Sequence, residues 1–360
     1  QQSGITGWET MGRAPRPGQL ALWATQSIAH GADTILFFRW RSCLMGTEQY
    51  WHGILPHNGI PGRCYHELRA FIQNTAPVLE QIQGTMPQNE VGILFSYDQE
   101  YAIDIQPHHP KMRYLSQVMS YYRALYSCNI GVDFLSAEAE FSKYRVIIAP
   151  LQYLMTEALA DKLKHYVKHG GTLVLTMRAG IKDENNLCFD HGALPHMLSE
   201  LCGIEVEEYD CLREMDGLVC WDEKEYGCEI LSLTTAEPLA VYAREFYAGA
   251  PAITRNSYGS GKVYYVGTQM QDALAQRFIK ELISHDKVTK TITAPEGVEI
   301  VSREGKEKRW FFVLNHTDRV QPFSAPDEWK LCLGESGQEL APFAARCYMA
   351  ENTETPTLKI

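Results

Sequence analysis

Short apolar runs alternate with segments of helical periodicity between about residues 90 and 180, and this alternation limits the possible folds more than any other feature. Residues 112–127 and 156–168 repeat their apolar side chains every three or four positions, as helices do. Four mainly apolar segments have the length of strands: 91–97, 132–135, 144–149 and 172–176. Strands and helices that alternate with short links predict an α/β domain with a doubly wound parallel sheet.

The chain divides into three predicted units, since its 360 residues exceed one typical core. They are residues 1–84, 85–287 and 288–360. In the second unit we also expect helices at 194–202 and 273–284 and a strand at 263–267. In the third unit, Gly305 lies between two apolar runs and predicts a hairpin. With further strands expected at 330–333 and 345–349, this unit reads as a small antiparallel β domain.

The first unit predicts a helix, a strand, a long loop and a second helix. The helix at 19–30 ends at Gly31, as helices commonly do. A wholly apolar run at 34–38 reads as a buried strand. The second helix, at 62–83, contains Pro77, which we expect to kink or split it.

Charge and cysteine content exclude several classes of function. The net charge is -11 and the isoelectric point about 5.6, so the surface repels nucleic acid and anionic lipid. No apolar run approaches the ~20 residues that span a bilayer. The ten cysteines form no CxxC pair and are scattered, which predicts reduced, cytoplasmic thiols and no zinc site. The residues from Gln1 onward do not have the pattern of a signal peptide. A neutral partner such as a sugar is compatible with this balance.

Four groups of residues near the N-terminus carry a resemblance to a known family. They are Pro15-Arg16-Pro17-Gly18-Gln19-Leu20, His30-Gly31-Ala32-Asp33, Phe37-Phe38-Arg39-Trp40-Arg41 and the run from Gly46 to His57. Their order and spacing over some fifty residues strongly resemble the end of the catalytic barrel in glycoside hydrolase family 42 beta-galactosidases. The rest of the chain also looks like that family.

The resemblance implies the fold of each unit. Residues 1–84 would be the end of a (β/α)8 barrel, residues 85–287 a flavodoxin- or amidotransferase-like trimerisation domain, and residues 288–360 the small β domain. It also implies a homotrimer, no cofactor, and retaining hydrolysis of terminal non-reducing β-D-galactose. In this family a Gln and then a Trp follow the nucleophile, as Gln1, Gln2 and Trp8 would here. The nucleophile would stand just before Gln1 and the acid/base further upstream, so we expect no catalytic glutamate in this chain and no activity from it alone.

Four residues are candidates for binding the substrate: Trp8, Phe38, Glu48 and Trp51. Aromatic faces suit the C–H groups of a pyranose, and a carboxylate can accept two sugar hydroxyls. A solvated glutamate and core aromatics are the ordinary alternatives. The resemblance favours function for Glu48 and Trp8. Phe38 is nearly as plausible in a core, and Trp51 stands where some members carry a sugar-contacting His.

Two rival hypotheses remain from the sequence. Residues 85–287 have no Cys after the strand at 172–176, where a working amidotransferase would carry its nucleophile. They read as a scaffold, so the chain could be a non-catalytic oligomerisation module. An independent flavodoxin-like domain lacks a ligand motif, because the pair Gly259 and Gly261 is a weak phosphate-loop match. Glu9, near Trp8, is expected to be structural.

Overall fold

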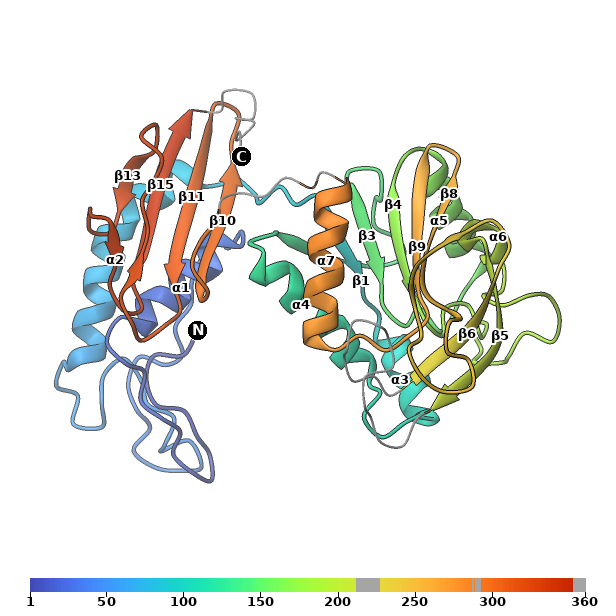
Figure 1. Cartoon of the computed structure of the whole chain (residues 1–360). Coiled ribbons are helices and arrows are strands. Elements are labelled where there is room, and N and C mark those ends of the chain that lie inside the picture. The colour runs from blue at the N-terminus through green and yellow to red at the C-terminus, as the bar shows by residue number, and fades with distance from the viewer. Residues whose placement is uncertain (212–226, 287, 289–292, 352–360) are drawn as a thin grey trace. The chain divides into compact units, whose positions relative to one another are not determined.

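The computed structural model describes residues 1–211, 227–286, 288 and 293–351, which fall into two compact units (Figure 1). One unit joins Gln1–Gln88 with Thr291–Ile360, and the other is Asn89–Lys290. The first and third segments of the chain therefore share one core.

The unit Asn89–Lys290 is built on a seven-stranded sheet of order β2-β1-β3-β4-β9-β8-β7. Its strands are β1 Val91–Leu94, β2 Val132–Leu135, β3 Val146–Ala149, β4 Thr172–Thr176, β7 Glu237–Val241, β8 Pro251–Tyr258 and β9 Gly261–Val266. The first five in this order pair in parallel, and β8 and β7 are added antiparallel. The predicted parallel sheet is present, with an antiparallel extension at one edge.

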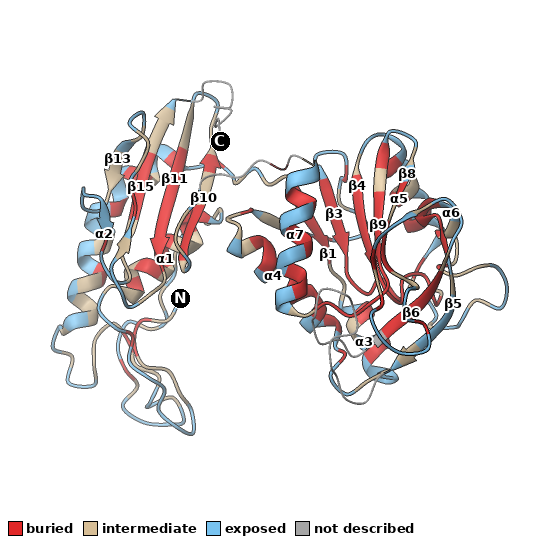
Figure 2. Ribbon diagram, in the orientation of Figure 1, coloured by how far each residue is buried: buried red, intermediate tan, exposed pale blue. Residues whose placement is uncertain are grey.

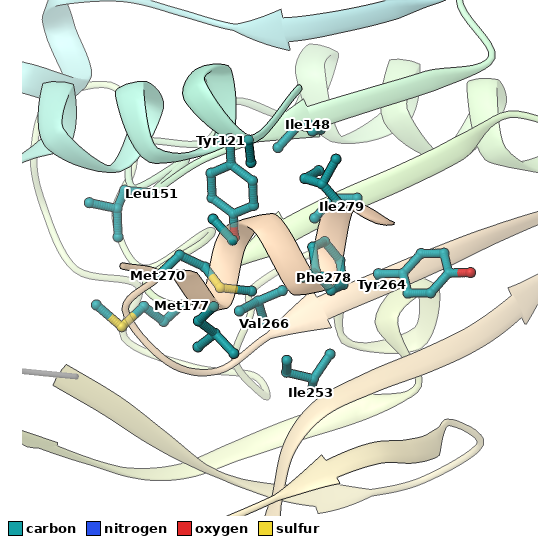
Figure 3. Packing of buried hydrophobic residues seen from close by; sticks show 14 of the residues in the cluster. Tyr121, Ile148, Leu151, Met177, Ile253, Tyr264, Val266, Met270, Phe278 and Ile279 are labelled. Atoms are coloured by element: carbon teal, nitrogen blue, oxygen red, sulfur yellow. The ribbon is translucent and has the colours of Figure 1, made fainter. Parts of the chain in front are cut away.

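Helices cover both faces of this sheet, as a doubly wound domain requires. They are α3 Tyr97–Ile105, α4 Tyr114–Ser127, α5 Glu157–Lys168, α6 Ser199–Cys202 and α7 Asp272–Asp286. Buried side chains of α4 and α7 form one core with the sheet, where Tyr121 and Phe278 meet at a ring separation of 6.5 Å (Figures 2 and 3). Buried side chains of α5 and α6 form a second core on the other face.

Several elements of this unit differ from the predictions. A two-stranded sheet of β5 Ile204–Cys211 and β6 Gly227–Leu233 was not predicted, nor were β7, β8 and α3. Helix α6 begins only at Ser199, because Met197 has a φ of 63° and interrupts the helical backbone. Gly259 lies in the turn that joins β8 to β9 and has a φ of 59°, so the glycine pair makes a hairpin.

In the other unit, two helices pack on one face of an antiparallel sheet of order β10-β11-β15-β13. The strands are β10 Val298–Glu304, β11 Lys308–Asn315, β13 Lys330–Leu333 and β15 Ala345–Glu351, with a small pair of β12 Gln321–Pro322 and β14 Glu339–Leu340 beside them. The helices are α1 Gln19–Ala29 and α2 Arg63–Ile82. Their buried faces meet Trp310, Phe312 and Leu314 of β11. The predicted hairpin at Gly305 joins β10 to β11.

One prediction for the first 84 residues is wrong, and another is wrong in part. The run Thr34–Phe38 is not a strand: Phe38 alone makes a bridge, parallel to Gln2, and Leu36 is 78% exposed. A buried parallel strand needs a neighbour along its length on each side, and the described chain provides none for this run. Pro77 does not split the second helix, since α2 continues through it. A kink at Pro77 stays a prediction.

Candidate functional site

The candidate residues lie in two loops, one before α1 and one after it. Hydrogen bonds from the buried side chain of Ser3 hold the two loops together. The Ser3 hydroxyl lies 2.9 Å from the carbonyl oxygen of Phe38 and 3.3 Å from those of Arg39 and His52. The Phe38 N–H donates to the carbonyl of Gln1 at 3.0 Å. Ser3 is fully buried, so these contacts fix the N-terminal segment against both ends of the 38–52 loop.

Three of the candidates form one aromatic cluster. The rings of Trp8 and Trp51 are 5.5 Å apart between centroids and tilted by 38°. Phe38 meets Trp51 edge-on at 6.1 Å. Trp51 is the central member, while Trp8 is 63% and Phe38 48% exposed. The two outer rings leave apolar surface open to solvent, which can stack on the C–H face of a sugar ring.

Glu48, the fourth candidate, is tied to this cluster through Arg39. One Arg39 guanidinium nitrogen lies 3.0 Å from Oε2 of Glu48, and the guanidinium carbon lies 5.1 Å from the Phe38 ring centre. The backbone N–H of Trp51 donates to the backbone carbonyl of Glu48 at 3.0 Å. One carboxylate oxygen is held by Arg39, and the other can accept a hydrogen bond from a ligand.

Sequence reasoning missed Arg39. A cation between two aromatic residues, Phe38 and Trp40, was the available signal, because an arginine in such a run can both stack on a ring and orient a carboxylate. The indole N–H of Trp51 is buried and has no acceptor within the described part of the chain.

Two histidines, His52 and His57, contact each other in the segment that follows Trp51. The rings of His52 and His57 are 5.1 Å apart, and His57 Nε2 lies 2.9 Å from the carbonyl of Gln49. Burial, and then the neighbouring His57, lower the pKa of His52. Glu9 is exposed beside Trp8.

Within the described residues, no three His, Cys, Asp or Glu side chains are grouped as a metal ion requires, and no helix is long and apolar enough to cross a membrane.

Family models match three consecutive parts of the chain. Residues 89–289, more than half of it, match the "Beta-galactosidase trimerisation domain". Residues 1–77 match the "Beta-galactosidase" model, and residues 297–346 match the "Beta-galactosidase C-terminal domain". The chain belongs to the glycoside hydrolase family 42 beta-galactosidases.

Curated family 42 relatives agree over most of the chain. Beta-galactosidase BgaA of Clostridium cellulovorans is 33% identical over 92% of this chain and 51% of its own length. Beta-galactosidase LacZ of Heyndrickxia coagulans is 33% identical over 89% of this chain and 49% of its own length. The chain thus spans about half the length of these relatives.

The fold agrees equally well with solved members of family 42. A beta-galactosidase from Bacillus circulans sp. alkalophilus superposes with a TM-score of 0.90 at 29% identity, over 97% of this chain and 54% of that one. Gan42B, described as a GH42 beta-galactosidase from G. stearothermophilus, gives 0.90 at 28% identity, over 98% and 53%.

Proposed function

We propose that a longer polypeptide containing this chain hydrolyses terminal non-reducing β-D-galactose residues with retention of configuration. The observation that carries the proposal is the group formed by Trp8, Phe38 and Trp51 beside the Glu48–Arg39 ion pair. It combines open aromatic faces with a charged acceptor, the composition that neutral sugars bind. The group lies in residues 1–77, which match the family's beta-galactosidase model.

In this proposal Glu48 accepts hydrogen bonds from galactose hydroxyls, and Arg39 holds its carboxylate in place. Trp8 and Phe38 stack on the sugar, with Trp51 supporting them. Retention requires a nucleophile and an acid/base about 5–5.5 Å apart. The resemblance puts both upstream of the position that Gln1 occupies, so the present chain would supply walls of the galactose site and not the reacting carboxylates.

The test compares residues 1–360 with the longer polypeptide on a nitrophenyl β-galactoside. We expect turnover only from the longer polypeptide, because covalent catalysis cannot proceed without its nucleophile. Turnover by residues 1–360 that survives purification and is lost in Glu9→Gln would show that the chemistry had been assigned to the wrong residues.

We further propose that the protein is a homotrimer through residues 89–289, and that it works in the cytoplasm. The match to a trimerisation domain supports the first proposal. One side of α3 supports it too, since Tyr97, Tyr101 and Ile105 recur every four residues and are 65%, 62% and 74% exposed. Such an apolar stripe is the usual sign of a covered surface. The described cysteines are free thiols, in keeping with a reducing compartment.

A further inference from the structure

Two buried cations lie together beyond the carboxyl ends of β3 and β4 in the unit Asn89–Lys290. Arg178 follows β4 and is 7% exposed, and Lys182 is 8% exposed. Both lie against the ring of Tyr153, which follows β3: the Arg178 guanidinium carbon is 5.9 Å and the Lys182 ammonium 5.3 Å from its centre. The ring of Tyr209 covers Arg178 from 4.2 Å.

The available carboxylate does not satisfy Arg178. Glu229 is fully buried, and its oxygens accept the backbone N–H of Arg178 at 2.9 Å and the hydroxyl of Tyr265 at 2.6 Å. The closest guanidinium nitrogen is 3.8 Å from it, too far for a hydrogen bond. Nε and Nη1 of Arg178 are buried and have no acceptor among the residues that the structure describes.

Lys182 has no carboxylate within ion-pair distance among the described residues. A third group, His108, lies with its ring 5.5 Å from that of Tyr153, and its Nδ1 is buried without a partner. Burial, then Arg178 and Lys182, lower the pKa of His108 to about 4, so it is neutral at pH 7 and adds no further charge. Two buried cations therefore face one carboxylate whose oxygens already accept other donors.

An unpaired buried charge is strongly unfavourable, and proteins bury lysine and arginine almost only when an anion neutralises them. Open α/β sheets also bind ligands beyond the carboxyl ends of their strands. We propose that Arg178, Lys182 and His108 form a binding site for a small oxyanion, the carboxylate or phosphate group of a small molecule. Guanidinium and ammonium donors suit either group.

The site binds and does not react. The two residues that follow β4 are Met177 and Arg178, and neither side chain can serve as the nucleophile that an amidotransferase carries there. The nearby thiol of Cys211 donates to the carbonyl of His108 at 3.3 Å, and burial raises the pKa of that thiol. A protonated thiol is a poor nucleophile.

Calorimetry and thermal unfolding of the whole chain test the site. Inorganic phosphate and acetate are titrated separately at constant ionic strength, with sodium chloride as the balancing salt. At ten times its Kd, the better anion should raise Tm by roughly 3–6 °C. Preference for phosphate or for acetate then tells a phosphoryl ligand from a carboxylate ligand.

Lys182→Met should weaken binding of that anion by at least tenfold and remove the rise in Tm. Lys280→Met, which changes an exposed lysine on α7 of the same unit, should bind like the unchanged chain. If the unchanged chain binds neither anion, or if both variants bind equally, the proposal is wrong. If Lys182→Met does not fold, as circular dichroism would show, Lys182→Gln is measured under the same criteria.

Discussion

Arg303 and Asp33 form an ion pair of 2.7 Å in which the guanidinium is fully buried while the carboxylate reaches solvent. Arg303 lies on β10 and also donates to the carbonyls of Ile28, Ile82 and Thr85. The first two belong to the last turns of α1 and α2, whose carbonyls have no partner within the helix. One side chain of the C-terminal segment thus caps both helices of the N-terminal segment.

We expect Arg303→Met to destabilise this unit by about 3 kcal/mol or more, because Asp33 and several carbonyls each lose one hydrogen-bond donor at the same time. Urea unfolding measures the change. Arg69→Met, on the exposed side of α2, is the matched control and should change stability by less than about 0.5 kcal/mol. Equal effects of the two substitutions would show that the buried network does not hold the helices.

Such charged core residues explain why the union of the two chain ends could not be predicted from sequence. Glu299 and Arg303 both lie on β10. Charged residues at these two positions would ordinarily indicate a strand at the surface. Only the tertiary structure shows that α1 and α2 cover that face. The division of the chain into 1–84, 85–287 and 288–360 stays a prediction about domains. The structure adds that the outer two share a core.

The elements that were predicted are those with a strong local pattern. Strands β3 and β4 follow from continuous apolar runs, and helix α5 follows from a 3.6-residue period. Strand β5 was missed because most of its side chains are exposed and its sequence, Ile204–Cys211, is rich in acidic residues. The run Thr34–Phe38 was wrongly predicted to be a strand. An apolar run indicates that burial is favourable, but it does not show whether neighbouring strands are present to pair with it.

For the candidate site, the aromatic residues could be predicted and their grouping could not. Trp8 and Trp51 are 43 positions apart in the sequence, and their contact depends on the Ser3 hydrogen bonds to the 38–52 loop. The roles assigned to Trp8, Phe38, Glu48 and Trp51 stay predictions that substitution can test.

The buried carboxylate of Glu299 should make the stability of the folded unit depend on pH. Glu299 is 4% exposed and lies 2.7 Å from the ring nitrogens of both His30 and His316. Burial raises its pKa, but the hydrogen bonds and charges of the two histidines outweigh burial and lower the pKa to about 2, from 4.5. A carboxylate whose pKa is lower in the folded state stabilises that state above pH 4.5, and this contribution is lost as the pH falls towards 2.

The advantage of the unchanged chain over Glu299→Gln should therefore shrink by about 3 kcal/mol between pH 5 and pH 2. Urea unfolding at several pH values gives the difference directly and cancels the titration of other groups. Glu328→Gln, at an exposed glutamate of the same unit, should show a difference that does not vary with pH. A constant difference for Glu299→Gln would mean that its carboxylate is not stabilised by the histidines.

The proposed trimer predicts that a charge on the exposed side of α3 blocks assembly. Ile105→Glu should weaken association more than tenfold, because assembly would bury an unpaired carboxylate. Light scattering across a dilution series should give three times 40.8 kDa for the unchanged chain. Leu187→Glu, at a similarly exposed apolar residue in a loop, should remain trimeric. A monomeric unchanged chain would contradict the trimer, and a trimeric Ile105→Glu would contradict only the proposed face.

The part of Glu48 in sugar binding can be measured in the longer polypeptide. A hydrogen bond from a sugar hydroxyl to a charged carboxylate contributes roughly 1.5–3 kcal/mol, so Glu48→Gln should lower kcat/KM by about ten- to a hundredfold. Gln can still accept the Arg39 hydrogen bond, which keeps the loop in place. Glu9→Gln, at an exposed carboxylate near Trp8, should leave kcat/KM unchanged.

The role of Arg39 is tested by a double substitution. Arg39→Met should reduce kcat/KM through the orientation of Glu48, so the same substitution should reduce kcat/KM by a smaller factor when Glu48→Gln is already present. Unchanged kinetics in Glu48→Gln, with Tm also unchanged, would make Glu48 an ordinary loop residue whose ion pair with Arg39 serves only the loop.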